Sequence, residues 1–163
     1  MKVLPSVRYT RSALGGTFDR LHAGHKRLIA VAAALSDEVI LGITSDEFVK
    51  SMKSADVLSF NERRKAVDDY LSQIGAREKT QVVVLEDAFG PTPKDRILEA
   101  IFVTVDTVDN ALKLNQTRRQ AGLRPLEVII VPKVLAQTGG FVSSTRIRAG
   151  EIDADGRPIA GQG

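Results

Sequence analysis

The sequence predicts a doubly wound α/β fold, in which a Rossmann-like sheet of five parallel strands carries flanking helices. Apolar runs of strand length alternate along the chain with segments in which apolar residues recur at helical spacing. Residues 38–44 also form a nearly continuous apolar run, which is typical of a parallel strand covered on both faces. The length of 163 residues favours a single domain over residues 1–163.

Five apolar runs bounded by turn residues are predicted as strands. They cover residues 7–14, 38–44, 81–85, 101–105 and 126–131. Ligands of such sheets bind at the carboxyl ends of the strands, where the strand order reverses. Because the first strand ends at Gly15 and the fourth ends near Asp106, the loops that follow them are expected to flank one crevice.

The segments between the strands are predicted as helices from their apolar spacing and their caps. Ser59 and Glu62 form a capping box, and Pro93 suits the first turn of a short helix. Ser36 and Asp37 are expected to break the helix that follows the first strand. The predicted helices run from after His25 to Leu35, over 60–74, from Pro93 onward, over 107–121, and from Ser143 to a stop at Gly150.

Composition narrows the range of functions. The chain has no cysteine, which excludes disulfides and thiolate metal sites and is compatible with a reducing cytoplasm. No apolar run approaches the roughly 18 residues of a membrane span. The net charge of +3 without a dense basic block favours small anions over nucleic acid. We therefore expect a cytoplasmic protein with no nucleic-acid or membrane partner, and the sequence carries no signal for an oligomeric state.

Two segments are expected to be less regular than the rest of the chain. Residues 45–58 are polar and should form a connection that carries Lys50 and Lys53. The tail from about residue 153 is rich in Asp and Gly and is expected to be frayed.

Residues 14–25, LGGTFDRLHAGH, carry the clearest functional signal. Gly15 and Gly16 let backbone N–H groups approach a ligand, and the start of the following helix suits phosphate. His22 and His25 are the only two histidines, and on a helical turn they share a face. A histidine near a helix start can also be a cap or a surface residue. The presence of both in one glycine-flanked turn favours a binding site.

Residues 143–148, SSTRIR, carry the second signal. Ser143, Ser144 and Thr145 precede a helix, where hydroxyl groups are first of all caps. Arg146 and Arg148 follow at once, so hydroxyl groups, helix N–H groups and guanidinium charge converge on one expected anion site.

These motifs resemble a known superfamily. Residues 15–25 are similar to the signature of HxGH nucleotidyltransferases, and the helix at 143–148 resembles that of phosphopantetheine adenylyltransferases. Asn115, Arg118 and the stretch 122–128, GLRPLEV, are similar to the archaeal and eukaryotic members of that family. The resemblance implies transfer of AMP from ATP to 4′-phosphopantetheine, which gives dephospho-coenzyme A and pyrophosphate in coenzyme A biosynthesis.

The alternatives are another nucleotidyltransferase acting on FMN, nicotinamide mononucleotide or glycerol phosphate, and a non-catalytic nucleotide-binding protein. Residues 139–145 lack the leading Arg-Thr that cytidylyltransferases usually carry here. In one departure from the family pattern, Val105 stands where relatives have an acid, and its role is left open.

The resemblance also implies the site residues. The expected ATP ligands are Gly15, Gly16, Thr17, Phe18, His22, His25, Ser143, Ser144, Thr145 and Arg146. His25 is expected to donate to the α-phosphate and His22 to the β/γ side. No general base is required, because the acceptor phosphate is already an anion.

The acceptor phosphate is expected to lie near Thr17 and to meet a lysine of the connection. Either Lys50 or Lys53 could fill this role, and Lys50 is assigned as the catalytic one. Mg²⁺ would bridge the triphosphate and keep most of its waters, so no protein metal site is expected. Asp19 and Asp46 are therefore interpreted as structural residues.

Overall fold

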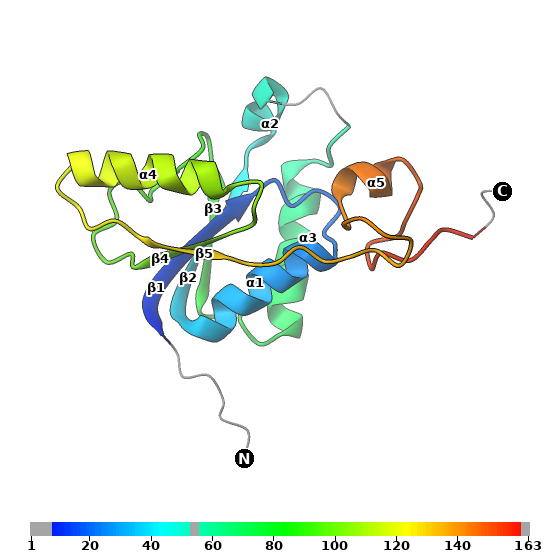
Figure 1. Cartoon of the computed structure of the whole chain (residues 1–163), viewed down its shortest axis with the longest axis horizontal. Coiled ribbons are helices and arrows are strands. Elements are labelled where there is room, and N and C mark those ends of the chain that lie inside the picture. Colours follow the sequence, from blue (N-terminus) through cyan, green and yellow to red (C-terminus); the bar gives the residue numbers. More distant parts are fainter. Residues whose placement is uncertain (1–7, 53–55, 161–163) are drawn as a thin grey trace, which may run out of the picture.

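The computed structural model describes residues 8–52 and 56–160 (Figure 1). Its elements, in chain order, are β1 Tyr9–Gly16, α1 Ala23–Leu35, β2 Ser36–Thr44, α2 Asp46–Met52, α3 Phe60–Gln73, β3 Thr80–Leu85, β4 Ala100–Val103, α4 Val108–Gln120, β5 Glu127–Ile130 and α5 Ser144–Arg148. In this described part, no helix is long and apolar enough to cross a bilayer.

The five strands form one parallel sheet in the order β3-β2-β1-β4-β5. This confirms the predicted fold class. The order reverses between β1 and β4, which is the place where doubly wound sheets bind ligands. Gly15 of β1 lies beside Gly42 of β2, so this edge of the sheet has no side chain at two neighbouring positions.

Side chains of the central strands alternate between two apolar cores. Val39 and Leu41 pack with α1 and α3 on one face, whereas Ile40 packs with Leu114 of α4 on the other. Figure 1 shows α4 on one side of the sheet and α1 and α3 on the opposite side. The nearly continuous apolar run of β2 is thus explained by burial on both faces.

Local chemistry corrects several expected boundaries. β2 begins at Ser36 itself, because the Ser36 hydroxyl is buried against the Ser12 hydroxyl at 2.7 Å instead of ending in a loop. β4 ends at Val103, two residues earlier than predicted. The connection over 45–58 contains α2, whose first turn is capped by the Ser45 hydroxyl, which accepts from the Phe48 N–H at 3.0 Å.

The short helix predicted at Pro93 is wrong. Residues 91–94 form turns, and Asp95 accepts from the N–H groups of Ile97 and Leu98 at 2.9 and 3.1 Å. A side chain that bonds the backbone two and three residues ahead offers an alternative to the helical bonding pattern.

The expected fraying from residue 153 is also wrong for the described part of the tail. Ile152 is fully buried against Ala136 and Val142. The N–H of Ala23, at the start of α1, donates to the carbonyl of Ala154 at 2.9 Å. Apolar burial and backbone pairing thus hold a segment whose composition suggested disorder.

Candidate active site

A cavity of about 430 Å³ opens at the carboxyl ends of β1 and β4. It is lined by Gly15, Gly16 and Thr17 after β1, and by Thr104 and Asp106 after β4. The expected crevice between these two loops is therefore present. The cavity continues over the sheet face beneath α4, where its walls are apolar.

The two histidines form a reciprocal cap at the start of α1. Nδ1 of His22 accepts from the N–H groups of Gly24 and His25 at 3.1 and 3.4 Å, and the His22 N–H donates to Nδ1 of His25 at 3.2 Å. The two rings stack at 3.6 Å with an interplanar angle of 18°. The capping interpretation is thus correct for His22, while His25 lines the cavity as a site residue would.

Burial keeps His22 neutral. Its side chain is buried, and this desolvation lowers its pKa from 6.5 to about 4, although Asp19 acts in the opposite direction. Within the described part of the chain, His22 is not among the residues that line the cavity. Its predicted contact with the β/γ-phosphates remains a prediction.

The loop that follows β1 adopts an unusual backbone. Phe18 and Arg20 have φ values of 53° and 49°, in the left-handed region that non-glycine residues rarely adopt. Phe18 is buried, and its ring meets that of His25 edge-on at a centroid distance of 5.3 Å. Two left-handed residues within three positions indicate a loop held by its surroundings.

Asp19 makes the contacts that fix this loop. Its carboxylate accepts from Arg20 and Arg148 at 2.7 Å each and from the Leu58 N–H at 2.9 Å. Although burial acts to raise its pKa, these hydrogen bonds and the charge of Arg20 leave the pKa below its usual value. The interpretation of Asp19 as structural is therefore supported.

Arg63 is a site-supporting residue that the sequence interpretation missed. It is fully buried and donates to the carbonyl oxygens of Leu58 and Thr17 at 2.8 Å, and to Asp46 at 3.1 Å. It therefore fixes the backbone of Thr17 at the cavity. The signal was available, because Arg63 lies on the apolar face of α3, four residues before the buried Val67.

Of the residues at the start of the last helix, one lines the cavity and the others bond to neighbouring parts of the chain. Ser143 caps α5, and Ser144 lines the cavity while donating to the Asp19 carbonyl at 2.6 Å. Thr145 accepts from Arg148 at 3.2 Å. The expected convergence of these side chains on one point is only partial.

Arg146 turns toward the loop before α5. It donates to the carbonyls of Gly139 and Phe141 at 2.8 and 3.2 Å and pairs with Glu151 at 2.8 Å. It does not belong to the described lining of the cavity, so its predicted contact with ATP stays a prediction.

The connection after β2 contributes two apolar side chains to the cavity, Phe48 and Met52 of α2. Lys50 lies on the same helix and is exposed, but it is not among the described lining residues. Lys53 lies outside the described residues. The choice between the two lysines therefore remains open.

The residues that carried the finer resemblance hold in place the elements around the apolar lobe and do not themselves line the cavity in the described part of the chain. Asn115 pairs with both the N–H and the carbonyl of Leu126, at 2.7 and 2.9 Å. Arg118 is fully buried and donates to the carbonyls of Thr92 and Asp95 at 2.6 and 2.8 Å. These contacts tie α4 and β5 to the loop over residues 86–98. Val105, the departure from the family pattern, is exposed beyond the end of β4.

Comparison with known proteins agrees with this geometry. A family model described as cytidylyltransferase-like matches residues 13–150. A solved structure of a protein with unknown function from Archaeoglobus fulgidus superposes with a TM-score of 0.69 at 30% identity, and the match covers 82% of this chain and all of that one.

Curated relatives match over most of their length. The chain is 42% identical to a phosphopantetheine adenylyltransferase of Methanopyrus kandleri over 91% of its own length and 94% of that protein's. It is 38% identical to the phosphopantetheine adenylyltransferase of Pyrococcus abyssi over 94% and 98% of the two chains. The chain therefore belongs to the cytidylyltransferase-like family and, within it, to the phosphopantetheine adenylyltransferases.

Proposed function

We propose that this chain transfers AMP from ATP to 4′-phosphopantetheine and releases dephospho-coenzyme A and pyrophosphate. The observation that carries the proposal is a single cavity with two chemically distinct parts. A polar mouth holds His25, Thr17 and Ser144, and an apolar lobe extends beneath α4. The names of the curated relatives support the same reaction.

The polar mouth suits the reacting phosphates. His25 lies at the start of α1, where the positive end of the helix dipole favours an anion. Since Nδ1 of the His25 ring accepts a backbone N–H, the neutral ring carries its proton on Nε2 and can donate from there. Donation to an α-phosphate oxygen stabilises the charge that develops as the acceptor phosphate attacks and pyrophosphate leaves.

The apolar lobe suits the acceptor. Its walls include Ile40 of β2, Val83 of β3, Ile101 of β4, Leu114 of α4, and Phe89 of the loop after β3. The pantetheine arm is long, and its polar groups are mostly amides, so it needs apolar walls and a few backbone hydrogen bonds. A lysine of the connection, Lys50 or Lys53, would bind the acceptor phosphate.

Magnesium enters this proposal with the nucleotide. In the described ranges, no group of three or more acidic or histidine side chains could hold a metal ion, and the Asp19 carboxylate already accepts three hydrogen bonds. A Mg²⁺ ion carried by the triphosphate keeps most of its waters and needs no such group. Mg·ATP is therefore the proposed substrate, and the ion would neutralise phosphate charge.

A panel of acceptors tests the proposal. The chain is incubated with Mg·ATP or Mg·CTP and with 4′-phosphopantetheine, FMN, nicotinamide mononucleotide or glycerol phosphate, and pyrophosphate release is measured. We expect turnover with ATP and 4′-phosphopantetheine and little with the other pairs. Pyrophosphate release in the presence of another acceptor, with none in the presence of 4′-phosphopantetheine, would contradict the proposal.

A further inference from the structure

We propose that His22 is a positioning residue: its ring caps α1 and holds His25 as an Nε2–H donor at the cavity, without itself contacting the nucleotide. The inference concerns the same site and rests on the proposed transfer reaction. It replaces the sequence-based expectation that both histidines donate to phosphate.

The hydrogen bonds around the two rings assign their tautomers. Backbone N–H groups can only donate, so a ring nitrogen that receives one must be unprotonated. Nδ1 of His22 receives the N–H groups of Gly24 and His25, and Nδ1 of His25 receives the N–H of His22. Both neutral rings therefore carry their proton on Nε2. The His22 cap and the tautomer of His25 are two parts of one reciprocal arrangement.

Burial separates the roles of the two rings. His22 is 7% exposed as a whole residue, and among the described residues only His25 of the pair lines the cavity. The ring of His25 is held between the stacked face of His22 at 3.6 Å and the edge-on ring of Phe18 at 5.3 Å. Its orientation is thus fixed from two sides.

Gly24 makes this packing possible. A Cβ atom built at position 24 would lie 3.0 Å from Cε1 and 3.1 Å from Nδ1 of His22. The ring of His22 therefore folds back over the backbone at a place where a side chain would crowd it. The spacing of the motif, with glycine between the histidines, is explained by the cap as well as by ligand approach.

Two amide substitutions distinguish capping from donation. The side-chain oxygen of asparagine can occupy the place of Nδ1, and asparagine is among the best N-cap residues. The amide nitrogen of glutamine reaches the place of Nε2 instead. We expect His22→Asn to keep kcat within about threefold of the unchanged chain, and His22→Gln and His22→Ala to lose about tenfold or more, because a slightly misplaced His25 loses much of its effect.

The opposite pattern, with His22→Gln active and His22→Asn inactive, would overturn the proposal. The Asn and Gln variants form a matched pair, and the thermal midpoint of each reports whether it is folded. If the Gln variant does not fold, a kcat of His22→Asn reduced more than about tenfold in a folded protein still overturns the proposal.

Nitrogen-15 NMR tests the same idea without substrate. The chain has 2 histidines, so the ring signals of each can be assigned by comparison with His22→Asn. At pH 7.5 we expect His25 to carry its proton on Nε2 in the unchanged chain and in His22→Asn. A proton on Nδ1 of His25 in the unchanged chain would overturn the proposal. This result is independent of the acceptor panel, so failure of the proposed function would be recognised separately.

Discussion

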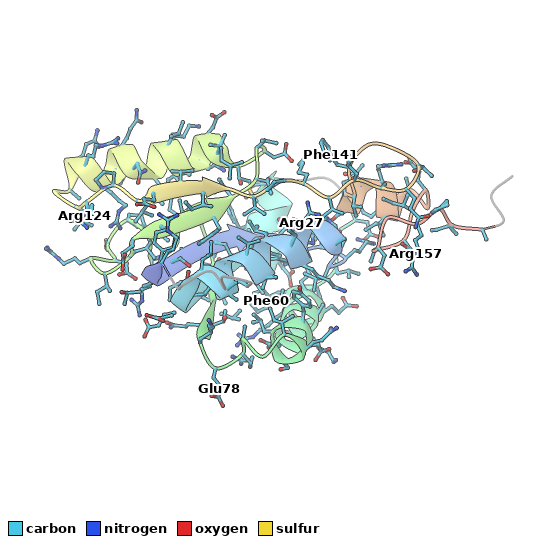
Figure 2. All side chains as sticks on the ribbon, turned by 60° about the horizontal axis from the view of Figure 1, so that its bottom comes forward. Arg27, Phe60, Glu78, Arg124, Phe141 and Arg157 are labelled. Atoms are coloured by element: carbon cyan, nitrogen blue, oxygen red, sulfur yellow. The ribbon has the colours of Figure 1, made fainter. Side chains whose placement is uncertain are left out.

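The guanidinium of Arg148 donates to the carboxylate of Asp19 at 2.7 Å, although the two residues are 129 positions apart. The bond ties α5 to the loop that follows β1. Arg20 and the N–H of Leu58 reach the same carboxylate, so three segments of the chain meet at one buried charge. In Figure 2, which turns the molecule by 60° from the view of Figure 1, α5 lies beside the N-terminal end of α1, which agrees with this connection.

Asp19→Asn should destabilise the fold. It removes the charge that pairs with two arginines, and the expected loss in the free energy of unfolding is about 3 kcal/mol, the scale for breaking a buried ion pair. Asp56→Asn is a matched control, because Asp56 pairs with Arg20 at 3.3 Å but its side chain is 89% exposed. We expect the control to change stability by less than about 0.5 kcal/mol in urea denaturation. Equal effects of the two changes would contradict a central role of Asp19.

His25→Ala should lower kcat by about 10²-fold, the scale for losing one oxyanion donor. The affinity for ATP, measured by calorimetry, should change much less, because the contact strengthens in the transition state. His25→Asn distinguishes donation to phosphate from capping of α1. The asparagine side chain can still accept from the His22 N–H, but it has no counterpart of Nε2. Recovery of kcat in His25→Asn would mean that the residue acts only through the cap.

Arg146→Ala tests the predicted role of α5 in holding the triphosphate. We expect ATP to bind about tenfold more weakly, which is the loss expected for one charge-assisted hydrogen bond. Binding of 4′-phosphopantetheine should be unchanged. Glu151→Gln is the control, because it removes only the ion pair with Arg146. Separate calorimetric titrations measure both ligands, and equal weakening of both would indicate a purely structural arginine.

Phe89→Ala should raise the KM for 4′-phosphopantetheine by about tenfold while leaving that for ATP nearly unchanged, since it removes part of the apolar wall of the lobe. Ile97→Ala changes an apolar side chain on the same loop that is 60% exposed and does not line the cavity, and it serves as the control. Steady-state kinetics with each substrate varied in turn provides the measurement. A raised KM for ATP with an unchanged KM for 4′-phosphopantetheine would contradict the prediction, because it would assign the apolar lobe to the nucleotide.

His22 should make folding stability depend on pH. Because its pKa is about 4 in the folded chain against 6.5 ordinarily, the unfolded chain binds the proton first as the pH falls. The stability contribution is complete above pH 6.5 and is lost between pH 6.5 and 4, by up to roughly 3 kcal/mol. His22→Asn lacks this titration. The free energy of unfolding of the unchanged chain, measured relative to that of His22→Asn, should therefore fall from pH 7 to pH 4.5. A constant difference would contradict a buried neutral His22.

Much of the architecture could be read from local patterns. The strand over 38–44 and the capping box of Ser59 and Glu62 follow from near neighbours in the chain, and both are present. The prediction of a helix at Pro93 was wrong, because the Asp95 side chain accepts hydrogen bonds from the backbone N–H groups that follow it. The frayed tail failed because Ile152 is buried against Val142, a contact that composition does not reveal.

The sequence by itself determined the order of the five strands, the glycine turn after β1 and the presence of both histidines at the start of α1. These depend on backbone preference and apolar periodicity, which act over a few residues. Only the tertiary structure decided that His22 faces inward as a cap, that Arg63 supports Thr17 and that Arg146 turns toward Gly139. Such choices depend on partners far apart in the chain, because a buried polar group takes whichever partner packing brings within hydrogen-bond distance.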